Sequence, residues 1–319
     1  MINLNYNLSS EKLKEIYLET LFSTKFGSAQ GNTVEKEFNN LKLDAPFDKI
    51  FDEITFEKII FKEPEKIEGL ITDIDKKIDE NPISEKDMEK LKEVFKYKGK
   101  FQAPISKFFE DNLETRTCYY CNIHFVNEYE FSEDINDENK NNKDKSRNEF
   151  TLDHYYDKGN YPYLALSLYN LIPSCYTCNS KLKKIERFEN LPPNSINFDF
   201  HEKIKFKLFL TKDCKDLNVE KSKNLEIKLK DEDENKYKKY REIFRLDERY
   251  NAHKDIVFEM IKKAEEYPDS RLKELQELTG IPFQKIKKDI FNLIEEDEDL
   301  SKKPFSKLIK DMSEELGLI

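Results

Sequence analysis

Three short stretches decide how the middle of this chain folds: CYYC at residues 118–121, TLDHY at 151–155 and YNLIPSCYTCNSKLK at 169–183. The first and the third each contain two cysteines separated by two residues, a spacing that presents two thiolates to one metal ion. Four thiolates complete the tetrahedral shell that zinc takes at structural sites. The expected ligands of one structural zinc ion are therefore Cys118, Cys121, Cys175 and Cys178.

The residues around the cysteines predict a strand hairpin followed by a helix. Residues 122–131 and 148–156 are rich in aromatic and β-branched side chains, which is typical of strands. LYNLI at 168–172 is a further short strand candidate, which Pro173 is expected to end. The helix should start near the second cysteine pair, and the polar residues 132–149 between the first two strands predict a loop.

Three polar side chains at the ends of these elements suggest a second, catalytic metal. Oxygen atoms of Asp153 and Asn179 suit a hard divalent cation such as Mg²⁺ or Mn²⁺. The imidazole of His154, with an ordinary pKa of about 6.5, can take a proton from water near neutral pH. Neighbouring strand residues point to opposite faces, so Asp153 and His154 can converge only if the strand bends or bulges there.

The helix is expected to carry a short basic stripe. Asn179, Lys183 and Arg187 follow one another at intervals of four, which places them on one helical face. Lys183 and Arg187 are therefore candidate contacts for nucleic-acid phosphates, with a plain solvated helix face as the alternative.

In this ordered combination the chain resembles the HNH endonucleases of the ββα-metal fold, over roughly Cys118 to Arg187. The resemblance implies His154 as the general base, Asp153 and Asn179 as ligands of the catalytic cation, and Asn170 as the asparagine that orients the loop and the base. The cysteine pairs match the zinc knuckles of one subgroup. The implied reaction is metal-assisted hydrolysis of phosphodiester bonds, in double-stranded DNA rather than RNA. The polar insertion at 132–149 is longer than is usual in the family.

The flanking regions predict an α+β protein of three parts. Residues 1–115 show helical spacing of apolar side chains, with Ser9 and Ser84 placed to cap helices. Residues 116–190 form the zinc-stapled ββα unit. Residues 191–319 alternate as strands and then become helical. Neither flank carries a recognisable chemical group.

Composition limits the other possibilities. Seven glycines and no glycine-rich phosphate motif argue against a nucleotide-binding enzyme. The amino terminus does not read as a signal peptide and no run of 18 apolar residues occurs, so a cytoplasmic protein without a membrane span is expected. A net charge of −10 is unusual for a nucleic-acid binder, so positive charge must be local or supplied by a partner.

Related proteins with large flanks often act in bacterial defence against phage, sometimes beside a separate ATPase, and the resemblance implies such a partner here. Two alternatives remain open. One is an inactive, zinc-stapled module that binds nucleic acid or protein. The other is a ribonuclease toxin.

Overall fold

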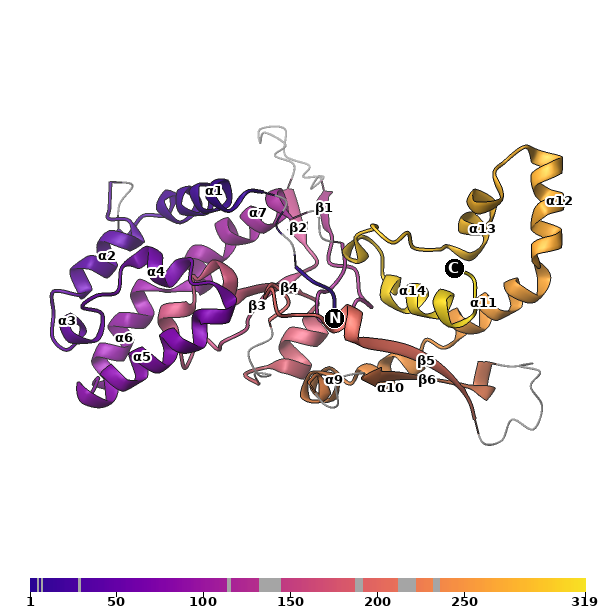
Figure 1. Cartoon of the computed structure of the whole chain (residues 1–319). Coiled ribbons are helices and arrows are strands. Elements are labelled where there is room, and N and C mark those ends of the chain that lie inside the picture. The colour runs from indigo at the N-terminus through magenta and orange to yellow at the C-terminus, as the bar shows by residue number, and fades with distance from the viewer. Residues whose placement is uncertain are drawn as a thin grey trace, which may run out of the picture. The chain divides into compact units, whose positions relative to one another are not determined.

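The computed structural model describes the chain except for residues 5, 7, 28–29, 114–115, 132–144, 187–191, 212–221 and 232–235. Of residues 128–131, 145–148 and 222 it describes the backbone alone. Helices occupy both ends of the chain, and the strands among the described residues pair into antiparallel hairpins, which confirms the α+β prediction (Figure 1).

The contacts divide the chain into two compact units. Unit 1 contains Met1–Ile2, Cys121–Ile123 and Asp199–Ile319, and unit 2 contains Asn3–Tyr120 and His124–Phe198. The predicted regions 1–115 and 116–190 thus fall almost wholly in unit 2. The predicted boundary at residue 190 lies among residues that the structure does not describe.

The N-terminal half of unit 2 is a group of amphipathic helices. Ser9 and Ser84 cap α1 and α6, because their hydroxyl oxygens accept from the amides of Lys12 and Asp87. The helix bounds are α1 Ser10–Ser23, α2 Val34–Leu41, α3 Phe47–Ile50, α4 Phe56–Ile60, α5 Ile67–Glu80, α6 Glu85–Val94 and α7 Gln102–Asn112.

Aromatic side chains form the core between these helices. Phe38 packs against Phe51 and Phe95 with ring centroids 5.4 and 5.7 Å apart, in edge-to-face geometry. Tyr17 is fully buried against Phe108, and its hydroxyl donates to the carbonyl of Leu166 at 3.0 Å. This hydrogen bond ties α1 to the segment that carries the candidate site.

Two hairpins follow the helices in unit 2. Strand β1 (Glu128–Phe131) pairs with β2 (Lys145–Asn148), so β2 occupies the end of the predicted polar loop. Strand β3 (Thr151–His154) pairs with β4 (Leu171–Ser174). The β3–β4 ladder is regular, with Asp153 opposite Ile172 and His154 opposite Leu171, so the expected bulge is absent from it. Directly after β4 comes the helical turn η5 (Thr177–Lys183).

Unit 1 consists of one long hairpin and the C-terminal helices. Strands β5 (Ile204–Leu210) and β6 (Leu225–Asp231) pair antiparallel, as their alternation predicts, and Ile204, Phe206, Ile227 and Leu229 are buried. The helix bounds are α8 Phe200–Lys203, α9 Lys238–Phe244, α10 Leu246–Asn251, α11 Asp255–Glu266, α12 Asp269–Thr279, α13 Phe283–Phe291 and α14 Ser306–Glu315.

Buried polar groups hold α14 in unit 1. Asn122 is fully buried, and its amide nitrogen donates to the carbonyls of Leu300 and Lys303, both at 3.1 Å. Its amide oxygen accepts from the backbone amide of Lys307 at 3.1 Å. One side chain therefore satisfies the backbone groups at the start of a helix, which a buried helix end requires.

Candidate metal centre and adjoining hairpin

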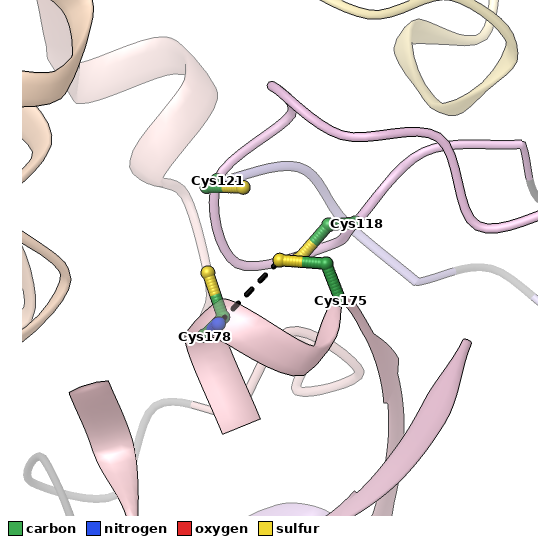
Figure 2. Close-up of side chains that lie close together, drawn as sticks. All are labelled: Cys118, Cys121, Cys175 and Cys178. Atoms are coloured by element: carbon green, nitrogen blue, oxygen red, sulfur yellow. Dashed lines mark hydrogen bonds between the residues drawn. The ribbon is translucent and has the colours of Figure 1, made fainter. Parts of the chain in front are cut away.

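The four cysteines of the two CxxC pairs come together. Their sulfur atoms all lie within 4.8 Å of one another, and all four residues are buried (Figure 2). Cys175 and Cys178 lie at the junction of β4 and η5, where the amide of Cys178 donates to the sulfur of Cys175 at 3.4 Å. Such an amide favours a thiolate over a thiol, because it donates to the sulfur.

This group can hold a metal ion. Four sulfurs at about 2.3 Å from a tetrahedral ion would lie about 3.8 Å apart, so the observed spacing needs little adjustment. Burial of four thiols without an oxygen or imidazole among them suits a soft, closed site rather than a catalytic one. Within the described ranges, it is the one group of three or more histidine, cysteine or acidic side chains with metal-binding spacing.

Asp153 lies in the middle of the candidate site, and its side chain is 2% exposed. Its carboxylate accepts from the hydroxyl of Tyr120 at 2.6 Å and lies 3.0 Å from the ammonium of Lys183. Burial raises the pKa of Asp153, while the charge of Lys183 and the Tyr120 hydroxyl oppose that rise. In this arrangement the carboxylate is the partner of a lysine.

The position of Lys183 corrects the expectation of an exposed basic stripe. Its side chain is fully buried, and the ammonium also donates to the carbonyl of His154 at 3.1 Å. Lys183 lies in η5, a π-type turn in which the amide of Lys184 donates to the carbonyl of Asn179. It shares a face with Asn179, as the spacing predicts, but that face packs against β3 and is not exposed to solvent. Arg187 lies outside the described residues.

His154 lies at the end of β3 and faces different neighbours. Its Nε2 is 3.0 Å from the carbonyl oxygen of Ala165, and its ring packs edge-on against Tyr97 with centroids 4.6 Å apart. A carbonyl oxygen only accepts, so Nε2 carries the proton and Nδ1 holds the lone pair. Burial lowers the pKa of His154 to about 3, and the positive charge of Lys158 adds to this effect. The imidazole is therefore neutral at pH 7, and it is a weaker base than the expected pKa of about 6.5 implies.

Asn170 organises the loop between β3 and β4. Its amide oxygen accepts from the backbone amide of Tyr156 at 2.7 Å, and its amide nitrogen donates to the carbonyls of Tyr156 and Leu164, both at 3.0 Å. The next residue after Leu164 is Ala165, whose carbonyl meets His154. Asn170 thus fixes the loop that positions the imidazole.

Asn179 lies at the start of η5, where its amide nitrogen donates to the hydroxyl of Thr151 at 2.9 Å. Thr151 and Asp153 are two residues apart on β3, so they share one face of the hairpin. The structure therefore brings Asp153, Asn179 and Lys183 to one face, and it gives the His154 side chain a separate set of partners.

Sequence reasoning missed the side chains that complete this site. Tyr120 lies inside the CYYC pair, and its hydroxyl was the available signal for a partner of Asp153. Tyr97 belongs to a helical segment 57 residues before His154, and no spacing in the sequence relates the two.

No protein-family model matches this chain, and neither the curated proteins nor the solved structures contain a match to it. Among the described residues, no helix has the length and apolar character to cross a lipid bilayer.

Proposed function

We propose that this protein is a metal-dependent nuclease of the HNH type that hydrolyses phosphodiester bonds in DNA. The observation that supports this most directly is the order β3, loop, β4, η5, with the buried cysteine cluster at the β4–η5 junction. A hairpin followed by a helical turn, with Asp153, His154, Asn170 and Asn179 on it, is the arrangement that the resemblance implies.

In the proposed reaction His154 is the general base. The Ala165 carbonyl holds the Nε2 proton, which leaves Nδ1 to take a proton from the attacking water. The oxygen of that water forms the new bond to phosphorus, the bond from phosphorus to the 3′ oxygen breaks, and the leaving oxygen takes a proton from solvent. Asn170 positions the base through the loop and touches no reacting atom.

A Mg²⁺ or Mn²⁺ ion held by Asp153 and Asn179 would supply charge stabilisation for the phosphate. The Asp153 carboxylate is paired with Lys183, so such an ion has to displace the ammonium from it. Cation binding and the lysine–aspartate pair therefore compete, and we derive no further step through the ion.

For the cysteine cluster we propose structural zinc, because four buried thiolates are the ligand set that zinc prefers. Elemental analysis of the purified protein should find about one zinc per chain. Replacing Cys178 by Ser should lower that content and destabilise the chain, whereas a full zinc content in the variant would contradict this ligand set.

The experiment for the nuclease is a plasmid-nicking assay with added Mg²⁺ or Mn²⁺. We expect nicking by the wild type and loss of nicking in His154→Ala, with zinc content and circular dichroism retained. A variant that cuts as fast as the wild type would overturn the assignment of the base. Offering RNA beside the plasmid separates a deoxyribonuclease from a ribonuclease toxin.

The buried pair of Lys183 and Asp153 favours a second candidate function. A carboxylate that is permanently neutralised by lysine has no need of a cation, which fits a zinc-stapled binding module without catalysis. That candidate predicts no nicking by the wild type under any metal, together with retained binding of nucleic acid or a protein. A defence role beside an ATPase stays a proposal that rests on the resemblance alone.

A further inference from the structure

We infer that Lys98, Lys100 and Lys158 form a surface, here called the lysine rim, that contacts the phosphate backbone of DNA on the His154 side of the hairpin. This inference rests on the proposed nuclease function and names its substrate contact. It replaces the expected contact by Lys183, whose ammonium is buried.

Tyr97 connects the rim to the candidate site. Its ring is buried and packs against His154 on one side, and the ammonium of Lys158 lies 6.0 Å from its centroid. The next residue along the chain is Lys98, which is exposed, as is Lys158. The exposed Lys158 therefore has its ammonium near the residue that packs on the proposed base, and the exposed Lys98 follows that residue in the chain.

The backbone after Tyr97 makes a sharp turn at Lys98 and Gly99. Lys98 is extended, with φ −69° and ψ 129°, and Gly99 has φ +80°, a conformation that favours glycine. Helix α7 begins three residues later, at Gln102. Gly99 and Lys100 also line a surface pocket of about 420 Å³ beside the first turns of α7. A surface hollow therefore adjoins the turn that carries Lys98.

The charge of the rim is not neutralised by the carboxylates that surround it. No carboxylate of the described chain lies within 4.0 Å of the ammonium of Lys98, Lys100 or Lys158. Two acidic side chains close in sequence have other partners: Glu93 pairs with Lys96 at 2.8 Å, and Asp157 accepts from the amides of Gly159 and Asn160.

Glu110, which also lines the pocket, lies 3.7 Å from Lys107. Glu93 and Glu37 both act electrostatically on Lys100, whose ammonium packs over the ring of Phe26. Lys98 and Lys158 are therefore the charges of the rim that are most open to a ligand.

The ligand that we propose for this surface is a polyanion. The whole chain carries a net charge of −10, so a general attraction for nucleic acid is not expected. Lys98 and Lys158, which have no ion pair among the described residues, then provide local positive charge near the base. Phosphate contacts position a substrate without reading its sequence. The rim would hold the strand so that the scissile phosphate reaches His154.

The experiment measures DNA affinity of the full-length protein by fluorescence anisotropy with a labelled duplex, in buffer without added divalent cation. The test variant is Lys98→Glu/Lys158→Glu. The control is Lys49→Glu/Lys76→Glu, which changes two exposed lysines of α3 and α5 in the same unit and alters the net charge equally. Melting curves should be the same for all three proteins, because the four side chains are exposed.

We expect the rim variant to bind the duplex at least about tenfold more weakly, with a slope of log K against log salt reduced by about 2, and the control to change affinity less than about twofold. Equal weakening in both variants, or no DNA binding by the wild type, would overturn the inference. An unchanged affinity for DNA in the rim variant would also overturn it.

The cleavage assay keeps this result separate from the proposed function. If the wild type nicks plasmid and the rim variant nicks equally well, the DNA contact by the lysine rim is rejected and the nuclease proposal is kept. If DNA binding depends on the lysine rim while none of the proteins nicks plasmid, the nuclease proposal is rejected and the DNA contact is kept.

Discussion

Each of the two units buries a lysine–aspartate pair close to a buried asparagine, and the two arrangements differ in how many groups hold the carboxylate. In unit 1, Asp311 accepts from Lys307 one helical turn earlier at 2.6 Å and from the backbone amide of Phe206 at 2.8 Å, with Lys205 at 3.5 Å. In unit 2, Asp153 is held by Lys183 and the hydroxyl of Tyr120.

We propose that the pair in unit 1 stabilises the fold, whereas at Asp153 in unit 2 a cation can take the place of the lysine. The Asp311 carboxylate accepts from a backbone amide of β5 and pairs with Lys307 of its own helix, so its partners are present wherever α14 packs on β5. Asp153 depends on a single ammonium from η5, next to His154. Replacing a lysine by a divalent cation at Asp153 keeps a positive charge against the carboxylate, and nothing similar is expected at Asp311.

The largest expected effect breaks the pair in unit 1. Lys307→Met should destabilise unit 1 by about 3–5 kcal/mol, because it leaves a carboxylate buried beside a half-buried lysine 3.5 Å away. Added Mg²⁺ should give no recovery. Urea unfolding monitored by hydrogen exchange in α14 measures this, and a loss below about 1 kcal/mol would show that Asp311 is stabilised well enough without Lys307.

The matching change in unit 2 sharpens the comparison. Lys183→Met should cost about 3 kcal/mol without divalent cation, and Mg²⁺ or Mn²⁺ at about 100 times its dissociation constant should restore about 2.7 kcal/mol. Thermal melts with and without the cation test this, with Lys307→Met as the matched control. An equal response of both variants to the cation would remove the distinction between the two pairs.

The buried asparagines offer a third test, in which each substitution should lower the free energy of unfolding by about 2–3 kcal/mol. Asn170→Ala and Asn122→Ala both leave several backbone groups without partners, so both should lower the midpoint of unfolding. Only Asn170→Ala should also reduce plasmid nicking, measured at a temperature where the variant is folded. Loss of nicking in Asn122→Ala, under the same condition, would mean that the two asparagines do not differ in role.

The smallest expected effect is on how the stability of unit 1 depends on pH. Burial lowers the pKa of His201 below its usual 6.5, and the charge of Lys307 adds to this while Glu202 opposes it. Below pH 6.5 the unfolded chain therefore binds more protons than the folded chain, so stability falls as pH falls. This contribution has a slope of at most about 1.4 kcal/mol per pH unit.

His201→Gln should remove that contribution and flatten the curve between pH 6.5 and 5. Urea unfolding at several pH values measures the slope. An identical slope in the wild type and the variant would show that His201 titrates alike in both states.

Local patterns predicted much of this fold. The capping serines, the alternation of β5 and β6 and the spacing of the cysteines are encoded within a few residues, and the structure has helices, strands and a thiol cluster where they indicate. Pro173 was expected to end a strand but lies within β4. A two-stranded sheet has edges on both sides, so a strand can accommodate a residue without an amide hydrogen there.

What could not be predicted depends on groups distant in the chain. Lys183 meets Asp153 across 30 residues, and ordinary helical spacing places Lys183 on the same face as Asn179 without showing that this face packs against β3. The partners of His154, Tyr97 and the Ala165 carbonyl, come from another helical segment and from a backbone atom. A carbonyl has no signature in sequence.

The close packing of four thiols has a consequence for handling the protein. Without a bound ion, sulfurs within 4.8 Å of one another are near enough to oxidise in pairs once their thiolates meet an oxidant. A preparation that loses its metal in air would then trap crosslinked chains that cannot be reloaded until a reductant is supplied. The history of exposure to oxygen would thus determine how much of a sample can regain its metal.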